Sequence, residues 1–193
     1  MERIARLGAG KAFTAKDFLD IASRGTIDMT LSSLIREGLI RRVRRGLYDS
    51  PRVNPSLGGV LSPDIDEAAR AVARRHRWKI IPDGALAANL LGLSTQVPAK
   101  IVYLSDGPSK RIELGRVIHF KHARPQTFIG DDQKSALVVQ ALRSLGKDNV
   151  GPHVISRLRA VLSDSERRKL IKATQFGVDW IYETAARIAG EAT

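Results

Sequence analysis

The chain has 193 residues, of which 43% are hydrophobic, and its 32 Lys and Arg residues outnumber its 20 Asp and Glu residues, giving a net charge of +12. This composition supports a packed core and excludes wholesale disorder, and no stretch approaches the ~20 apolar residues that span a bilayer. Because the chain has no cysteine, disulfides, thiolate zinc sites and cysteine nucleophiles are excluded. The charge favours a polyanionic partner, either nucleic acid or an acidic protein.

A boundary between two domains is expected near residue 55. Residues 50–63 contain three Pro and two Gly residues, a density that interrupts helices and strands. We therefore predict one domain over residues 1–55 and a second domain over residues 60–193.

The first domain is expected to begin with two helices. Thr14 is a predicted N-cap for a short helix over residues 15–19. The side chains expected to bury one face of this segment are Phe13, Phe18, Leu19 and Ala22. A second helix is predicted from about Thr26 to Glu37, because apolar residues recur at intervals of three and four. These apolar residues are Ile27, Leu31, Leu34 and Ile35.

A basic hairpin is predicted after the second helix. Gly38 lies where a left-handed residue ends a helix, and Leu39 is expected to make the hydrophobic contact beyond it. Residues 39–43 predict a short strand, residues 44–46 predict a tight turn, and Leu47 begins the return strand.

The second domain is predicted to alternate helices and strands before a helical C-terminal part. Ser62 is expected to cap a helix that ends in the basic residues 74–77, and Asp83 is expected to cap a helix over residues 84–91. Strands are predicted over residues 79–82, 101–104, 111–114 and 117–121. Further helices are predicted over residues 132–145, 152–162, 164–174 and 177–189.

The order of elements in the first domain is that of a winged helix-turn-helix. In such a fold the second helix enters a major groove about 12 Å wide, while the hairpin tip reaches phosphates or the adjacent minor groove. The candidate DNA-binding residues are Arg24, Thr26, Thr30, Ser33, Arg36, Arg41, Arg42, Arg44 and Arg45. The predicted fold class is therefore α+β, with an N-terminal winged helix-turn-helix followed by a mixed α+β domain that has a helical C-terminal part.

Residues 34–51 resemble the N-terminal winged helix of AbiEi-type antitoxins. In that family a pattern of Leu, a basic residue, Glu, Gly, a hydrophobic pair, arginines, Gly, an aromatic residue and Pro recurs. Here the pattern runs from Leu34 through Gly38, Gly46 and Tyr48 to Pro51. Two further strings, at residues 82–94 and 102–107, are similar to the second domain of one subgroup of the family, so the resemblance covers most of the chain.

The resemblance implies a cytoplasmic antitoxin of a bicistronic toxin–antitoxin system. The first domain would bind inverted repeats in double-stranded DNA at the promoter of its own operon and repress it. The second domain would neutralise a nucleotidyltransferase-like toxin without requiring a stable complex. The alternative is an ordinary winged-helix transcription regulator whose second domain binds an effector or a partner.

Other residue clusters predict no catalytic, cofactor-binding or metal site. The acids Asp64, Asp66 and Glu67 lie where a helix begins, and the helix dipole accounts for acids there. His119 and His122 are three apart on a predicted strand and its exit, so they point to opposite faces. No phosphate-binding loop or dinucleotide motif occurs. We therefore expect neither an enzyme nor a membrane partner, and the N-terminus lacks the apolar stretch of a secretory signal.

Overall fold

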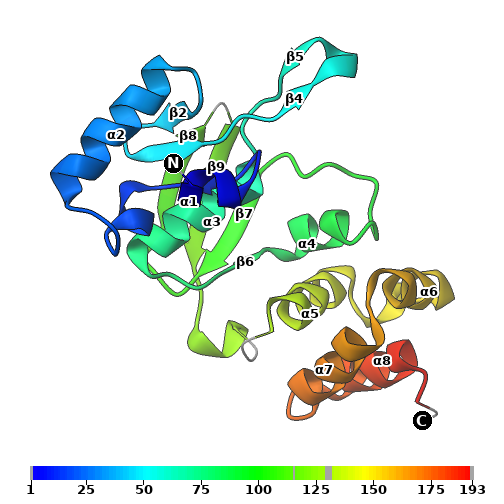
Figure 1. The fold of residues 1–193 in the computed structure, drawn as a ribbon. Coiled ribbons are helices and arrows are strands. Elements are labelled where there is room, and N and C mark those ends of the chain that lie inside the picture. Colours follow the sequence, from blue (N-terminus) through cyan, green and yellow to red (C-terminus); the bar gives the residue numbers. More distant parts are fainter. Residues whose placement is uncertain (1, 115, 129–131, 192–193) are drawn as a thin grey trace. The chain divides into compact units, whose positions relative to one another are not determined.

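Helices and strands are interspersed up to residue 122, and the elements described after it are helices, in the computed structural model, which describes residues 2–114, 116–128 and 132–191 (Figure 1). The fold class is α+β, as predicted. The chain forms two compact units, one made of Met1–Lys79 with Glu113–Ile118 and the other of Ile80–Ile112 with His119–Thr193. The division predicted at residues 55–60 therefore does not coincide with the division between these units.

The first unit contains a small antiparallel sheet with helices around it. In chain order its elements are α1 (Glu2–Leu7), β1 (Ala12–Phe13), the 3-10 helix η1 (Ala15–Phe18), α2 (Arg24–Arg36), β2 (Arg41–Arg44), β3 (Leu47–Asp49), β4 (Val53–Asn54), the 3-10 helix η2 (Pro55–Leu57), β5 (Gly59–Val60) and α3 (Ile65–His76). The strands of the sheet lie in the order β1-β3-β2, and β4 pairs with β5 in a separate antiparallel hairpin. The segment in which the sequence predicted only a break thus carries two short strands.

Helix α2 begins and ends at recognisable caps. The Ser23 hydroxyl accepts the Thr26 N–H at 3.3 Å, so the helix begins at Arg24, two residues earlier than predicted. Gly38 has a φ of +72°, and the Leu39 N–H donates to the Leu34 carbonyl at 3.0 Å, which is the hydrogen bond expected beyond a left-handed helix end.

The core of the first unit lies between η1, α2 and the sheet. Its buried residues are Phe13, Ala15, Phe18, Ile27, Leu31, Leu34 and Ile40, and Ile35 and Ala22 pack against them. The prediction was wrong for Leu19 and Leu39, which are each 49% exposed. Leu39 turns outward because the next residue, Ile40, is the one that enters the core, at 3% exposure.

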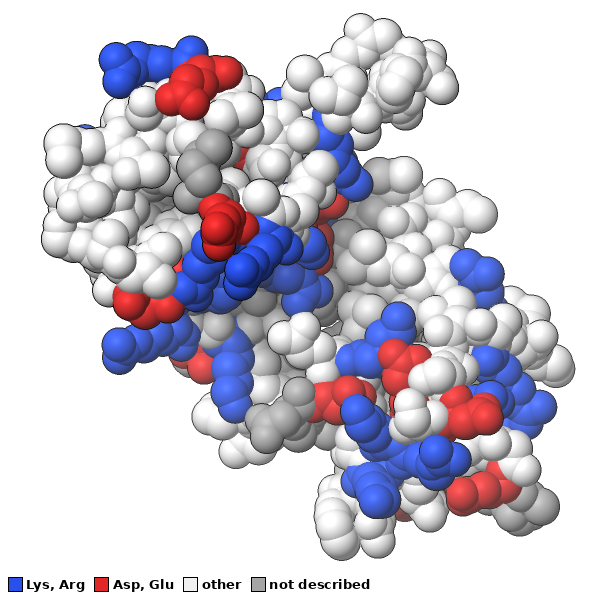
Figure 2. Space-filling view, in the orientation of Figure 1, with Lys and Arg blue, Asp and Glu red and all other residues white. Residues whose placement is uncertain are grey.

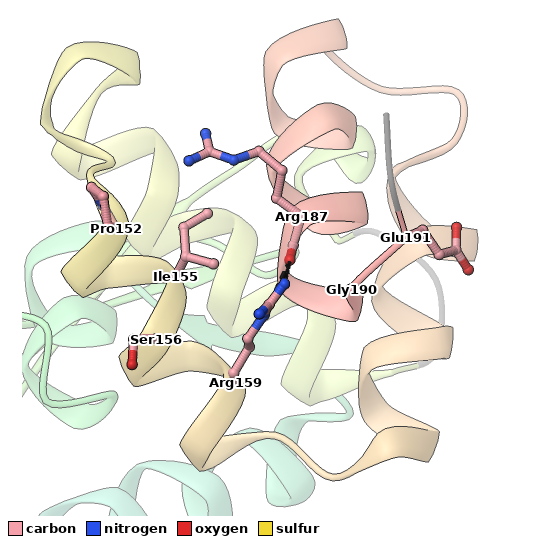
Figure 3. Close-up of a pocket in the computed structure, with 7 residues that line it drawn as sticks. All are labelled: Pro152, Ile155, Ser156, Arg159, Arg187, Gly190 and Glu191. Carbon is pink, nitrogen blue, oxygen red and sulfur yellow. Dashed lines mark hydrogen bonds between the residues drawn. The ribbon is translucent and has the colours of Figure 1, made fainter.

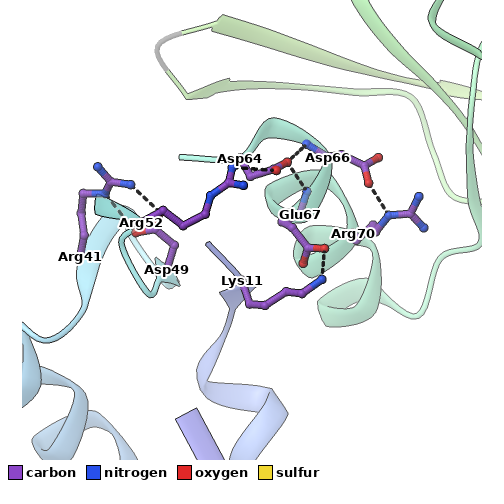
Figure 4. A network of polar contacts seen from close by, with 8 residues as sticks. All are labelled: Lys11, Arg41, Asp49, Arg52, Asp64, Asp66, Glu67 and Arg70. Atoms are coloured by element: carbon purple, nitrogen blue, oxygen red, sulfur yellow. Dashed lines mark hydrogen bonds and ion pairs between the residues drawn. The ribbon is translucent and has the colours of Figure 1, made fainter. Parts of the chain in front are cut away.

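Helix α3 belongs to the first unit because its polar residues are joined to the N-terminal segment. Arg74 Nη2 donates to the Ala12 carbonyl at 2.8 Å, and its Nε donates to Asp17 Oδ1 at 3.2 Å. Lys11 Nζ contacts Glu67 Oε1 at 2.6 Å (Figure 4). These contacts explain why the compact unit extends beyond the boundary predicted from Pro and Gly content.

The start of α3 also differs from the prediction. Asp64, rather than Ser62, is the N-cap, and its Oδ1 accepts the N–H groups of Asp66 and Glu67 at 3.0 and 3.2 Å. The apolar face of this helix is formed by Ala68, Ala69, Val72 and Ala73, which are all buried.

The second unit combines most of a four-stranded sheet with a group of helices. Its elements are β6 (Ile80–Pro82), α4 (Gly84–Leu90), β7 (Ile101–Ser105), most of β8 (Lys110–Leu114) and the end of β9 (Arg116–His122), the 3-10 helix η3 (Pro125–Thr127), α5 (Gln133–Leu145), the 3-10 helix η4 (Lys147–Asn149), α6 (Pro152–Val161), α7 (Asp164–Thr174) and α8 (Asp179–Ala189). The strand order is β6-β7-β9-β8. These elements lie within two residues of the predicted ones at nearly every end.

The helices of the second unit pack around one apolar core. Side chains from α4 to α8 form it, with Leu142, Leu158 and Ile188 fully buried and Trp180 packed against them. Val178, the N-cap of α8, is 48% exposed and lies outside this core. Within the described ranges, every helix is too short or too polar to cross a lipid bilayer.

Candidate nucleic-acid interface

The outward face of α2 carries hydroxyl side chains that are bonded within the helix. Thr30 is exposed, and its Oγ1 donates to the Thr26 carbonyl at 2.9 Å. Ser33 is half-buried, and its Oγ donates to Glu37 Oε1 at 2.8 Å. Because a hydroxyl has one proton and two lone pairs, both oxygens are left as acceptors toward an outside donor.

The N-terminus of α2 has a cation that is already paired. Arg24 Nε donates to Asp28 Oδ2 at 2.8 Å, and this hydrogen bond raises the pKa of the Arg24 guanidinium above its usual range. The Thr26 hydroxyl lies 2.9 Å from the Ser23 hydroxyl. Arg24 and Thr26, the two predicted site residues at this end, are therefore exposed, and each already contacts a neighbouring polar side chain.

The hairpin places three arginines in solvent. Strands β2 and β3 are joined by the turn Arg45–Gly46, where Gly46 takes a φ of +75° that favours glycine. The side chains of Arg42, Arg44 and Arg45 are exposed, and none forms a hydrogen bond or ion pair with another residue that the structure describes. The turn is one residue shorter than predicted, because Arg44 still pairs with Leu47.

Arg41 differs from the other arginines of the hairpin. Its Nη2 and Nε donate to Asp49 Oδ2 and Oδ1 at 2.6 and 3.0 Å, and its Nη1 donates to the Leu61 carbonyl at 3.0 Å. Asp49 is 1% exposed, so this bidentate pair joins β2 to β3 inside the unit (Figure 4). All three guanidinium nitrogens of Arg41 donate to groups of the same unit. We therefore exclude Arg41 from the proposed interface.

Ion pairing separates the arginines of residues 2–79 into two groups. Those paired with a carboxylate are Arg3, Arg6, Arg24, Arg41, Arg52, Arg70 and Arg74. Those whose side chains make no hydrogen bond or ion pair with another described residue are Arg36, Arg42, Arg44, Arg45, Arg75 and Arg77. The unpaired group thus lies at the end of α2, on the hairpin and at the end of α3.

Arg75 and Lys16 were not among the residues predicted from the sequence for DNA contact. Both line a small cavity together with Arg24 and Gly46. The basic residues at 74–77 are recognisable in the sequence, but no local pattern places them beside the hairpin turn.

Elsewhere, the charged residues are mixed in sign. On the face shown in Figure 2, Lys and Arg side chains are interspersed with Asp and Glu side chains. The acids at the start of α3 are paired, Asp64 with Arg52 at 3.3 Å and Asp66 with Arg70 at 2.6 Å. Among the described residues, no group of three or more His, Asp or Glu side chains is arranged to hold a metal ion.

A larger cavity in the second unit lies between α6 and the C-terminal end of α8 (Figure 3). Its residues include Ile155, Ser156 and Arg187. Arg159 also lines it, but its Nε donates to the Arg187 and Ile188 carbonyls, each at 3.2 Å. This arginine therefore caps α8 rather than offering a free cation to a ligand.

Comparison with known proteins places the chain in a family. A model described as a family of unknown function, DUF6088, matches residues 1–170. The chain belongs to the DUF6088 family. Among curated proteins, none matches it. The crystal structure of the RV2827C protein from Mycobacterium tuberculosis is similar to this DUF6088 member at 15% sequence identity and a TM-score of 0.40, over 98% of this chain and 75% of that chain.

Proposed function

We propose that this DUF6088 member binds double-stranded DNA through its first unit, with α2 in the major groove and the β2–β3 hairpin on the phosphate backbone. The observation that supports the proposal is the concentration of unpaired, exposed arginines at Arg36 and on the hairpin. An arginine without an internal carboxylate is free to neutralise a phosphate, and the release of counterions from DNA then favours binding. The paired arginines of the same unit contribute less, because each must first give up its partner.

The short side chains of α2 support the same assignment. Thr30 and Ser33 allow the helix backbone to approach the base edges, and their hydroxyl oxygens accept hydrogen bonds from base amino groups. Arg36, one turn further along, is long enough to reach a guanine or a phosphate. The helix thus offers residues for reading sequence and the hairpin offers residues for holding the backbone.

The test is the binding of the full chain to a fluorescein-labelled duplex, measured by anisotropy at several salt concentrations. We expect the logarithm of the association constant to fall linearly with the logarithm of salt concentration, with a slope of about −0.9 for each phosphate neutralised. A chain that binds the duplex no more tightly than a neutral dextran control, or binds it without salt dependence, would show that the proposal is wrong.

Alanine at Thr30 or Arg36 is expected to change the preference for sequence more than the affinity for DNA in general. Loss of a base contact weakens the binding free energy for the correct site by about 1–3 kcal/mol and leaves that for a scrambled site unchanged. The measurement is the ratio of affinities for the duplex upstream of the protein's own gene and for a scrambled duplex of equal length. Arg6→Ala, which removes a charge from α1, is the control, and a ratio equal to that of the control in both variants would exclude α2 as the reader.

We extend the proposal to an antitoxin that represses its own operon, on the resemblance of residues 34–51, 82–94 and 102–107 to AbiEi-type proteins. The corresponding experiment expresses the chain from an independent promoter in cells that also express the gene next to its own, which the proposal takes to encode the toxin. Restored growth supports the antitoxin, whereas DNA binding without rescue favours an ordinary transcription regulator.

A further inference from the structure

A small basic cavity lies where four parts of the first unit meet. Its volume is about 50 Å³, and its lining residues are Thr14, Ala15, Lys16, Arg24, Gly46 and Arg75. They come from η1 and the residue before it, from the first residue of α2, from the hairpin turn and from the last turn of α3. Ligand-binding pockets usually measure about 300–1,000 Å³, so this cavity is suited to a small ionic group and not to a base or a nucleotide.

The guanidinium of Arg75 lies directly against the hairpin turn. A Cβ added to Gly46 would be 3.0 Å from Arg75 Nη1, so glycine at this position leaves room for the arginine. Lys16 Nζ donates to the Arg75 carbonyl at 3.1 Å, which joins η1 to the end of α3. Arg75 is therefore placed beside the turn by its neighbours, while its own side chain has no partner among the described residues.

The charges of the cavity favour an anion. Lys16, Arg24 and Arg75 line it, and no carboxylate is among the lining residues. One carboxylate, Asp28, is bonded to Arg24, which leaves an excess of positive charge. A planar guanidinium that binds two oxygens at once is well matched to a phosphate.

We infer that this cavity receives a phosphate group of the DNA backbone, so that Arg75 and Lys16 belong to the DNA interface together with the hairpin. The inference rests on the proposed function and deepens it, because it adds the end of α3 to the bound surface. A phosphate held there would contact the start of α2 and the hairpin turn at the same time. Such a contact fixes the position of the backbone relative to both elements without reading sequence.

The test compares Arg75→Ala, Arg75→Lys and the wild type in the full chain, with a labelled duplex of mixed sequence between about 50 and 200 mM salt. We expect Arg75→Ala to reduce the salt slope by about 0.9, the value for one phosphate, and to weaken binding about tenfold. Arg75→Lys keeps the charge, so it should keep the slope and lose only part of the affinity. Arg6→Ala removes one exposed charge from α1 and should leave both quantities unchanged.

The outcomes separate this inference from the proposed function. If the wild type binds the duplex with a salt slope and Arg75→Ala has the same slope, DNA binding stands and the inference is overturned. If the wild type shows no salt-dependent binding, both the proposed function and this inference are overturned. A second experiment adds inorganic phosphate alone and measures the thermal stability of the protein. If phosphate stabilises the wild type but not Arg75→Ala, while both have the same salt slope for DNA, the cavity is a site for a free anion. That result would also overturn the inference. Because Arg75 is exposed, its alanine variant is expected to fold, and circular dichroism verifies this.

Discussion

Replacing Arg41 with alanine is expected to lower the free energy of unfolding by about 3 kcal/mol. Asp49 is 1% exposed and is bonded by both Nε and Nη2 of Arg41. Without the arginine, a buried carboxylate loses its counter-charge and two hydrogen bonds, and breaking a buried pair from one side costs about 3–5 kcal/mol. We take the lower end because the Arg41 side chain is 31% exposed and water reaches part of the pair. Urea denaturation of the full chain, followed by circular dichroism, measures the change.

Arg42→Ala is the matched control, because it removes the same side chain from the next position of the same strand. Arg42 is exposed and unpaired among the described residues, so its loss is expected to change stability by less than about 0.5 kcal/mol. Equal stability of the two variants would contradict the role assigned to the Arg41–Asp49 pair. At temperatures where Arg41→Ala stays folded, its salt slope for DNA should equal that of the wild type, and a lower slope would return Arg41 to the interface.

Alanine at Arg42, Arg44 and Arg45 together is expected to weaken binding to every duplex by about three orders of magnitude. Each arginine is expected to neutralise one phosphate, so the salt slope should decrease by about 2.7, and each charged hydrogen bond contributes about 1.5 kcal/mol. The loss should be similar for specific and scrambled duplexes, because backbone contacts carry no sequence information. Anisotropy titrations over a range of salt concentrations give both quantities.

A second triple variant controls for net charge. Arg168, Lys169 and Lys172 are exposed on α7 and lie outside the proposed interface. Alanine at these positions removes the same charge from the chain, so we expect it to leave the slope nearly unchanged. If both triple variants lose affinity equally, binding is due to the overall charge of the protein and the hairpin has no special role.

Helix α2 could be predicted from the sequence because its signals are local. The spacing of Ile27, Leu31 and Leu34 identified the buried face of α2, and Gly38 identified its end. The predicted start was two residues too late: Ser23 has the N-cap residue type, but Thr26 is also a favoured cap type. The choice between Leu39 and Ile40 could not be made from the sequence, since both are apolar and only the direction of the chain after Gly38 decides which one enters the core.

The four arginines of the hairpin have different roles, which their positions in the sequence do not distinguish. Four arginines within five residues predict phosphate contacts, but the sequence treats them alike. Antiparallel pairing across the turn puts Arg41 opposite Asp49, and only this register reveals that one of the four is used internally. Counting residues outward from the Arg45–Gly46 turn would have paired Arg42 with Asp49, because the register shifts by one residue between Arg42 and Arg44.

The predicted domain boundary and the division between compact units rest on different physical signals. Pro and Gly density reports where hydrogen-bonded elements stop, whereas a compact unit is defined by contacts between elements. Two contacts hold α3 in the unit, the salt bridge between Lys11 and Glu67 and the hydrogen bond from Arg74 to the Ala12 carbonyl. Each joins residues that are more than fifty positions apart in the chain. No local pattern encodes such pairs, so the membership of α3 and the position of Arg75 could not be predicted.

The first compact unit includes Glu113–Ile118 as well as Met1–Lys79, so it cannot be completed until the ribosome has translated Ile118. A nascent chain that has reached Lys79 still lacks one part of the unit, which emerges only after the intervening segment has been made. At about 5–20 residues per second, translation needs about 2–8 s to go from Lys79 to Ile118. During that interval the candidate DNA-binding elements have already emerged but their unit is incomplete. Any partner that engages the nascent chain in those seconds meets a different surface from that of the finished protein.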